Sequence, residues 1–341
     1  MVYYTDSTTH QSIQLCRQCY NHGDVLLQSA QQCKVCTLMN DDKCIICEVC
    51  VDNIRSFEVV RVLFDNFIDS RILLRVELCS NIDINGGYTP SITLMNQVNQ
   101  TLYGNKSNIP IHTLIREDTN MRYGSIPPYN LDGIYCDGVV LGGLNNDMTL
   151  DINTMHCHDQ YAMTVHRCID CTPDIIQSTK LLIDGVSANC VDPYKTNTRY
   201  RANYILSSGG ASTATDGLST IKQMNELVAN TGVHIIAAGG INDSNVKHIM
   251  NFTGIHCIHG SFRDDVDTDV PINRIKSPLA ALFGINITTR YKQTSSQILL
   301  NVLEQIKQTD YYQQYMSCQS ITSYSTLHST CATVAGVVVD Q

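Results

Sequence analysis

Residues 233–260, VHIIAAGGINDSNVKHIMNFTGIHCIHG, contain two short apolar segments on either side of an amphipathic one. Val233–Ala238 and Gly254–Gly260 have the composition of strands that are buried on both faces. Ser244–Phe252, between them, has the apolar spacing of a surface helix. A strand, a helix and a second strand in this order predict a βαβ unit with parallel strands.

The same alternation extends toward the N-terminus. Six further apolar runs precede this unit, at Cys44–Val51, Leu73–Cys79, Ile109–Ile115, Gly133–Leu141, Tyr161–His166 and Tyr200–Leu206. Helix-like segments are found at Ser56–Phe67, Thr89–Leu102, Pro173–Val186 and Gly217–Val228, and Leu299–Ile306 has the pattern of a last outer helix. Eight strands in about 215 residues predict an α/β fold, a (β/α)8 TIM-like barrel over residues 44–310. An open doubly wound sheet is the alternative, which the count of eight disfavours.

Two local features of this pattern make sharper predictions. Thr89-Pro90-Ser91 predicts a helix start, with Thr89 as the N-cap and Pro90 in the first turn. Residues 116–133 contain two prolines, two glycines and no apolar periodicity. The third helix of the barrel is therefore expected to be short or missing.

Composition excludes several classes of protein. Apolar residues make up 43% of the chain and charged residues 16%, which is typical of a globular protein. The net charge of −9, without a basic block, argues against nucleic-acid binding. No apolar run approaches the length of a membrane span. The first residues, MVYYTDSTTHQS, lack the pattern of a secretory signal, so we expect a cytoplasmic protein. Residues 311–341, which become rich in Ser and Thr, are expected to form a C-terminal tail.

Cysteine is concentrated near the N-terminus. Seven of the 16 cysteines lie within the first 50 residues, and they include Cys16-x-x-Cys19 and Cys33-x-x-Cys36. Paired C-x-x-C turns suit a tetrahedral zinc site. The polar residues between the pairs show no clear fold pattern, however. Residues 1–43 are thus either a small zinc-binding module, with Cys16, Cys19, Cys33 and Cys36 as ligands, or a poorly ordered Cys-rich extension.

The strand ends carry a family resemblance. RVELC at 75–79, GGYTPS at 86–91 and VHRCID at 165–170 occur with this order and spacing. Together they resemble the copper homeostasis protein CutC family, from about residue 46 to about residue 265. The resemblance implies a TIM-like barrel, a cytoplasmic location and copper binding. The chain departs from the family pattern after Arg116 and in an insertion at 187–199.

A copper site is the first functional hypothesis. Side chains two residues apart on a strand share a face, so Glu48 points with Cys50 and Glu77 with Cys79. On neighbouring strands this arrangement predicts a Glu–Glu layer below a Cys–Cys layer at the mouth of the barrel. The two thiols could hold Cu(I), a soft ion suited to sulfur ligands. Alternatively, both cysteines fill the core as small apolar residues.

An enzyme is the second hypothesis. Active sites of (β/α)8 enzymes lie at the C-terminal mouth. The titratable residues expected there are Glu48, Glu77, His112, Arg116, His166, Arg167 and Asp170. A neighbouring Glu and His offer a general acid and base with pKa values moved toward neutrality. The alternatives are that these groups only form ion pairs with one another, or that the altered loops have left no ancestral activity.

The loops that follow the later strands suggest the ligand of such an enzyme. The residues involved are Ser208, Gly209, Gly239, Gly240, His259 and Ser261. Many barrels bind phosphate through backbone N–H groups after the seventh and eighth strands. The expected partner is therefore a copper ion or a small anionic ligand bearing phosphate or carboxylate. The sequence leaves the oligomeric state open, a homo-oligomer included.

Overall fold

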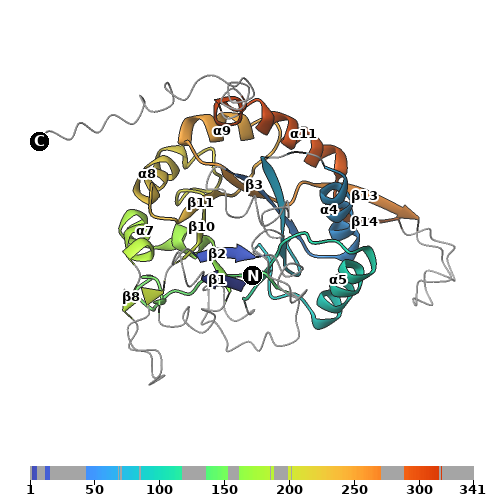
Figure 1. The fold of residues 1–341 in the computed structure, drawn as a ribbon, viewed down its shortest axis with the longest axis horizontal. Helices are drawn as coiled ribbons and strands as arrows, with labels where there is room; N and C mark the ends of the chain where they lie inside the picture. Colours follow the sequence, from blue (N-terminus) through green and yellow to red (C-terminus); the bar gives the residue numbers. More distant parts are fainter. Residues whose placement is uncertain are drawn as a thin grey trace, which may run out of the picture.

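In the computed structural model the chain forms a closed barrel of eight parallel strands, with helices on its outer surface (Figure 1). The structure describes residues 2–5, 12–15, 44–67, 69, 71–83, 86–116, 136–152, 161–184, 186–187, 199–200, 202–269, 288–314 and 316. The barrel strands are β3 (Ile45–Val51), β4 (Ile72–Leu78), β5 (Ile111–Leu114), β6 (Gly138–Leu141), β7 (Ala162–Val165), β10 (Tyr204–Ser207), β11 (His234–Ala237) and β12 (Cys257–Gly260). β12 pairs with β3 and closes the barrel. The predicted (β/α)8 barrel is therefore confirmed.

The outer helices cover the barrel with their apolar stripes. They are α4 (Ile54–Asn66), α5 (Ile92–Asn105), α7 (Ile175–Asp184), α8 (Leu218–Val228), α9 (Val246–Thr253) and α11 (Ser296–Lys307), and the 3-10 helix η2 (Arg167–Cys171) follows β7. In α11 the buried residues are Leu299, Val302, Leu303 and Ile306, spaced as one helical face. These faces pack on the outward side chains of the strands, and together they form the hydrophobic core.

The start of α5 differs from the prediction. The N-cap is Ser91, whose Oγ accepts a 3.2 Å hydrogen bond from the Leu94 N–H, and the helix begins at Ile92. Thr89 is not the cap because its hydroxyl is engaged elsewhere. It accepts from the Arg116 N–H at 2.8 Å and donates to the Arg116 carbonyl at 2.9 Å. Thr89 thereby ties the loop after β4 to the end of β5.

Three small antiparallel sheets accompany the barrel: β1 (Val2–Thr5) with β2 (Ser12–Leu15), β8 (Val186–Ser187) with β9 (Arg199–Tyr200), and β13 (Arg263–Asp269) with β14 (Thr288–Thr294). The last pair extends outward beside α4 in Figure 1. It is attached to α4 through the Thr294 N–H, which donates a 3.0 Å hydrogen bond to Ser56 Oγ.

Several expectations concern residues that the structure does not describe. The expected defect in the third helix falls in 117–135, and the four cysteines of the predicted zinc module fall in 16–43. Most of the insertion and of the C-terminal tail also lie outside the described residues. Within the described part of the chain, no helix has both the length and the apolarity needed to cross a bilayer.

Candidate functional site

The interior of the barrel contains a buried ion pair. Glu48 on β3 accepts a 2.6 Å hydrogen bond from Arg75 Nε on β4, and it pairs with His259 Nδ1 at 3.1 Å. The Arg75 guanidinium also lies over the Tyr204 ring, 4.2 Å from its centre. Burial opposes the charge on Glu48, but the Arg75 charge and the His259 hydrogen bond outweigh burial and hold the pKa of Glu48 well below its usual range.

The register of β3 and β4 corrects the predicted layers. Glu48 lies opposite Arg75, and Cys50 lies opposite Glu77. The strands of a closed barrel are staggered, so residues at equivalent motif positions do not face each other across the ladder. The Glu–Glu layer was therefore a wrong prediction, because an arginine is the ladder partner of the first glutamate.

The two cysteines nevertheless meet. The Sγ atoms of Cys50 and Cys79 lie 3.4 Å apart, and Cys50 Sγ lies 3.3 Å from Glu77 Oε1. Both cysteines are buried, and Cys79 Sγ donates to the Val51 carbonyl. The diagonal contact arises because Cys79 lies one residue beyond the end of β4, where it reaches back toward β3.

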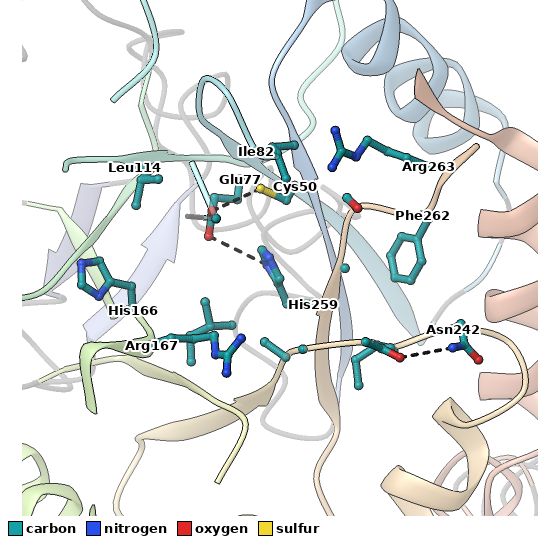
Figure 2. Close-up of a pocket in the computed structure, with 18 of the residues that line it drawn as sticks. Cys50, Glu77, Ile82, Leu114, His166, Arg167, Asn242, His259, Phe262 and Arg263 are labelled. Carbon is teal, nitrogen blue, oxygen red and sulfur yellow. Dashed lines mark hydrogen bonds and ion pairs between the residues drawn. The ribbon is translucent and has the colours of Figure 1, made fainter. Parts of the chain in front are cut away.

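His259 on β12 completes this group. One ligand atom each from Cys50, Glu77 and His259 lies within 4.8 Å of the other two. Figure 2 shows the Glu77 carboxylate between the Cys50 sulfur and the His259 ring. Among the described residues, Glu77 Oε2 has no hydrogen-bond partner, and its ion-pair distance to His259 Nδ1 is 3.8 Å. This group of three side chains, with Cys79 behind it, is called the cysteine cluster below.

The pKa values in the cysteine cluster are set by burial and mutual charge. The hydrogen bond with Cys79, together with burial, raises the pKa of Cys50 well above its ordinary value. For Cys79 the hydrogen bond with Cys50 lowers the pKa, but burial and the charges of Glu77 and Asp52 together outweigh it, and the net direction of the pKa is upward. Burial raises the pKa of Glu77. Burial lowers that of His259, but the Glu77 charge and the hydrogen bonds outweigh burial and raise it. Both thiols are therefore protonated at neutral pH.

A pocket opens above the cysteine cluster, at the C-terminal ends of the strands. Its volume is about 790 Å³. Nine of the predicted residues line it: Cys50, Glu77, Arg116, His166, Arg167, Gly239, Gly240, His259 and Ser261. Figure 2 shows side chains from opposite walls of the pocket, with His166 and Arg167 on one side and Arg263 and Phe262 on the other.

Comparison with known proteins identifies the fold family. The CutC family model matches residues 45–264, which is more than half of the chain. The chain belongs to the CutC family. A CutC family protein of Glaesserella parasuis is 30% identical over 229 residues, which cover 63% of this chain and 81% of the relative. A copper homeostasis protein cutC homolog of Dictyostelium discoideum is 29% identical over 217 residues, 57% of this chain and 76% of that protein. The solved structure of a CutC protein from Streptococcus agalactiae covers 64% of this chain and 98% of its own, with a TM-score of 0.50 and 23% identity.

Two of the residues expected at the mouth of this CutC barrel lie deeper. Glu48 and His112 are both fully buried and are not part of the pocket wall. His112 Nδ1 pairs with Thr164 Oγ1 at 3.3 Å, and its ring lies where a Cβ on Gly138 would stand. Burial and the Arg75 charge lower the pKa of His112 well below its usual value. Arg116 lies two residues beyond the end of β5 and lines the pocket, whereas His112, on β5 itself, lies below it.

Three more of the predicted residues lie behind the pocket wall: Asp170, Ser208 and Gly209. Asp170 accepts hydrogen bonds from Arg167 Nε at 2.8 Å, from Ser207 Oγ at 2.6 Å and from the Ser208 N–H at 3.0 Å. Gly209 donates its N–H to Ser207 Oγ. These residues therefore position Arg167 and the loop after β10 in the family member described here. They do not line the pocket themselves.

Sequence reasoning missed Arg75 as a member of the site. Arg75 precedes Glu77 by two residues, so the alternation of a strand already places both on one face. Phe262, Asn242 and Arg263 of the pocket wall were also missed. Asn242 and Phe262 lie in loops after β11 and β12, and Arg263 begins β13, outside the barrel strands. No periodic pattern there indicates which side chains point inward.

Proposed function

We propose that this CutC family member is a copper-homeostasis protein that binds one Cu(I) ion at Cys50 and Cys79. The observation that carries the proposal is the 3.4 Å contact between the two sulfurs beside the pocket. Metal–sulfur bonds of about 2.3 Å, as in zinc sites, allow two sulfurs to be up to about 4.6 Å apart. The sulfurs therefore have a spacing that one ion can bridge.

The chemistry of the donors also fits copper. Thiolate sulfur and imidazole nitrogen are ligands that Cu(I) accepts, whereas Mg²⁺ and Ca²⁺ prefer oxygen donors. His259 offers an imidazole nitrogen within 4.8 Å of the Cys50 sulfur. The name of the Dictyostelium relative, a copper homeostasis protein cutC homolog, supports the same function. We place the protein in the cytosol, which keeps thiols reduced and available to a soft metal.

Binding must displace protons. The raised pKa values of Cys50 and Cys79 mean that both thiols are protonated before copper arrives. A metal that takes two thiolates therefore releases about two protons, and its apparent affinity rises with pH. The cationic Arg75 then compensates part of the negative charge that the thiolates bring into the barrel.

The test is an anaerobic Cu(I) titration of the full chain against a chromophoric competitor. Because the N-terminal cysteines also offer thiols, the titration is performed on a chain in which Cys16, Cys19, Cys33 and Cys36 are serine. We expect one tightly bound Cu(I), lost on Cys50→Ser and on Cys79→Ser. Cys257→Ser is the matched control, since Cys257 is fully buried inside the same barrel outside the cluster. Equal copper affinity in all four proteins would overturn the proposal.

A further inference from the structure

The pocket above the cysteine cluster is much larger than a metal ion requires. Its volume of about 790 Å³ lies within the range of about 300–1,000 Å³ that is typical of sites for small organic molecules. An ion held by Cys50 and Cys79 would occupy only the floor. The remaining space is lined by loops that follow β7, β11 and β12, and these carry polar groups that a copper site does not use.

One of these groups is Arg167, whose guanidinium is held in place by hydrogen bonds. Its Nε donates to Asp170 at 2.8 Å, and its Nη2 donates to Ser208 Oγ at 2.5 Å and to the Ala211 carbonyl at 3.2 Å. Within the described part of the chain, Nη1 has no hydrogen-bond partner. It lies over Gly239, 3.3 Å from the position that a Cβ there would take. In Figure 2 the guanidinium reaches toward the open centre of the pocket. A fixed donor of this kind suits an anion.

Two further loops offer donors to the same space. Gly239 and Gly240, after β11, have φ values of +95° and +74°, and neither carries a side chain that would keep a ligand from the backbone. Ser261, after β12, lines the pocket, and its hydroxyl makes no hydrogen bond to any described residue. In barrels of this class the loops after the seventh and eighth strands are the usual phosphate site. Donors on three separate loops match the three terminal oxygens of a phosphate group better than the two of a carboxylate.

The end of the pocket at the cysteine cluster offers a hydrogen-bond acceptor instead of donors. Glu77 is almost fully buried, and its Oε2 has no hydrogen-bond partner among the described residues. An acceptor without a donor in a buried place is costly unless a ligand supplies one. A hydroxyl group is such a donor.

We propose that this pocket binds a hydroxyl-bearing phosphate monoester, with its phosphate on Arg167, Gly239, Gly240 and Ser261 and a hydroxyl directed to Glu77. The site is distinct from the copper ligands, although it shares the floor of the pocket with them. Ribose 5-phosphate is a suitable probe because it carries both groups, and it is added without copper, so the result does not depend on the copper proposal.

The test is isothermal titration of the full chain with ribose 5-phosphate, inorganic phosphate and ribose, at constant ionic strength. We expect the two phosphates to bind and compete with each other, and ribose alone not to bind. Arg167→Gln should weaken both phosphates by about tenfold or more, the loss expected for a hydrogen bond to a charged group. Arg61→Gln is the matched control, because Arg61 is also paired with carboxylates but lies on α4.

Ser261→Ala keeps the test decisive if Arg167→Gln fails to fold. The Ser261 hydroxyl makes no hydrogen bond to a described residue, so the Ser261→Ala variant should fold normally. We expect it to lose phosphate affinity by about fivefold to tenfold. Phosphate affinity that is equal in the wild type, Arg167→Gln and Ser261→Ala would overturn the proposal. So would phosphate that binds no better than chloride, or binding of ribose alone as tight as that of its phosphate.

Discussion

The Glu48 carboxylate and the Arg75 guanidinium form a 2.6 Å ion pair inside the barrel, where both side chains are almost fully buried. Each charge would be costly alone in such a place. Arg75 has further support from the Tyr204 ring, and Glu48 from His259. The pair therefore holds β3, β4, β10 and β12 in one arrangement beneath the cysteine cluster.

Removal of one partner should destabilise the barrel strongly. Arg75→Met leaves Glu48 buried without its main counter-charge, and we expect a loss of about 3–5 kcal/mol in the free energy of unfolding. Urea denaturation measures this. Arg61→Met, which breaks two ion pairs at the surface, should cost less than about 1 kcal/mol. Equal losses of unfolding free energy in the two variants would show that the interior pair stabilises the barrel no more than the surface pairs do.

Stability should depend on pH through His166. Burial, together with the Arg116 charge, lowers the pKa of His166 to about 3, against an ordinary value of 6.5. The unfolded chain therefore binds a proton below pH 6.5 that the folded chain does not bind. This contribution to stability is fully present above pH 6.5, and it is lost at up to about 1.4 kcal/mol per pH unit as the pH falls toward 3.

Denaturation midpoints at several pH values test this dependence. His166→Gln removes the titrating group, so its stability should fall less steeply between pH 6.5 and 3 than that of the wild type. His248→Gln, on the exposed face of α9, should follow the wild-type curve. Parallel curves for the wild type and His166→Gln would show that His166 is not held neutral by the fold.

Two glycines should respond to alanine in opposite directions. A Cβ on Gly138 would lie 2.5 Å from His112 Nε2, inside the barrel, and overpacking of this kind costs about 1–3 kcal/mol. A Cβ on Gly104 in α5 meets no atom within 4 Å, and alanine in a helix is favoured over glycine by about 0.5–1 kcal/mol. Thermal unfolding should place Gly138→Ala below the wild type and Gly104→Ala above it. The reverse order would contradict this account of the barrel interior.

The fold could be predicted from sequence because its strands are buried on both faces and appear as separate apolar runs. The run Cys44–Val51, for example, coincides with β3 to within one residue. The meeting of Cys50 with Cys79 also followed from two motifs on adjacent strands. Apolar periodicity and motif spacing, which are local properties, were sufficient for both predictions.

The stagger of the strands could not be predicted in this way. Nothing local to β3 or β4 indicates that Cys50 lies opposite Glu77 rather than opposite Cys79. The stagger follows from closure of the whole barrel, and it decides that Glu48 pairs with Arg75. The depth of His112 and the inward direction of Phe262 depend on the same closure and on loop geometry.

The central claim is that one copper ion is bound by the sulfurs of Cys50 and Cys79. Copper K-edge X-ray absorption tests it most directly, on the full chain loaded with one equivalent of Cu(I) and with Cys16, Cys19, Cys33 and Cys36 replaced by serine. We predict a first shell that contains two sulfur atoms in this protein and loses them on Cys50→Ser/Cys79→Ser. A first shell of nitrogen and oxygen only, or sulfur that survives the double substitution, would contradict the claim.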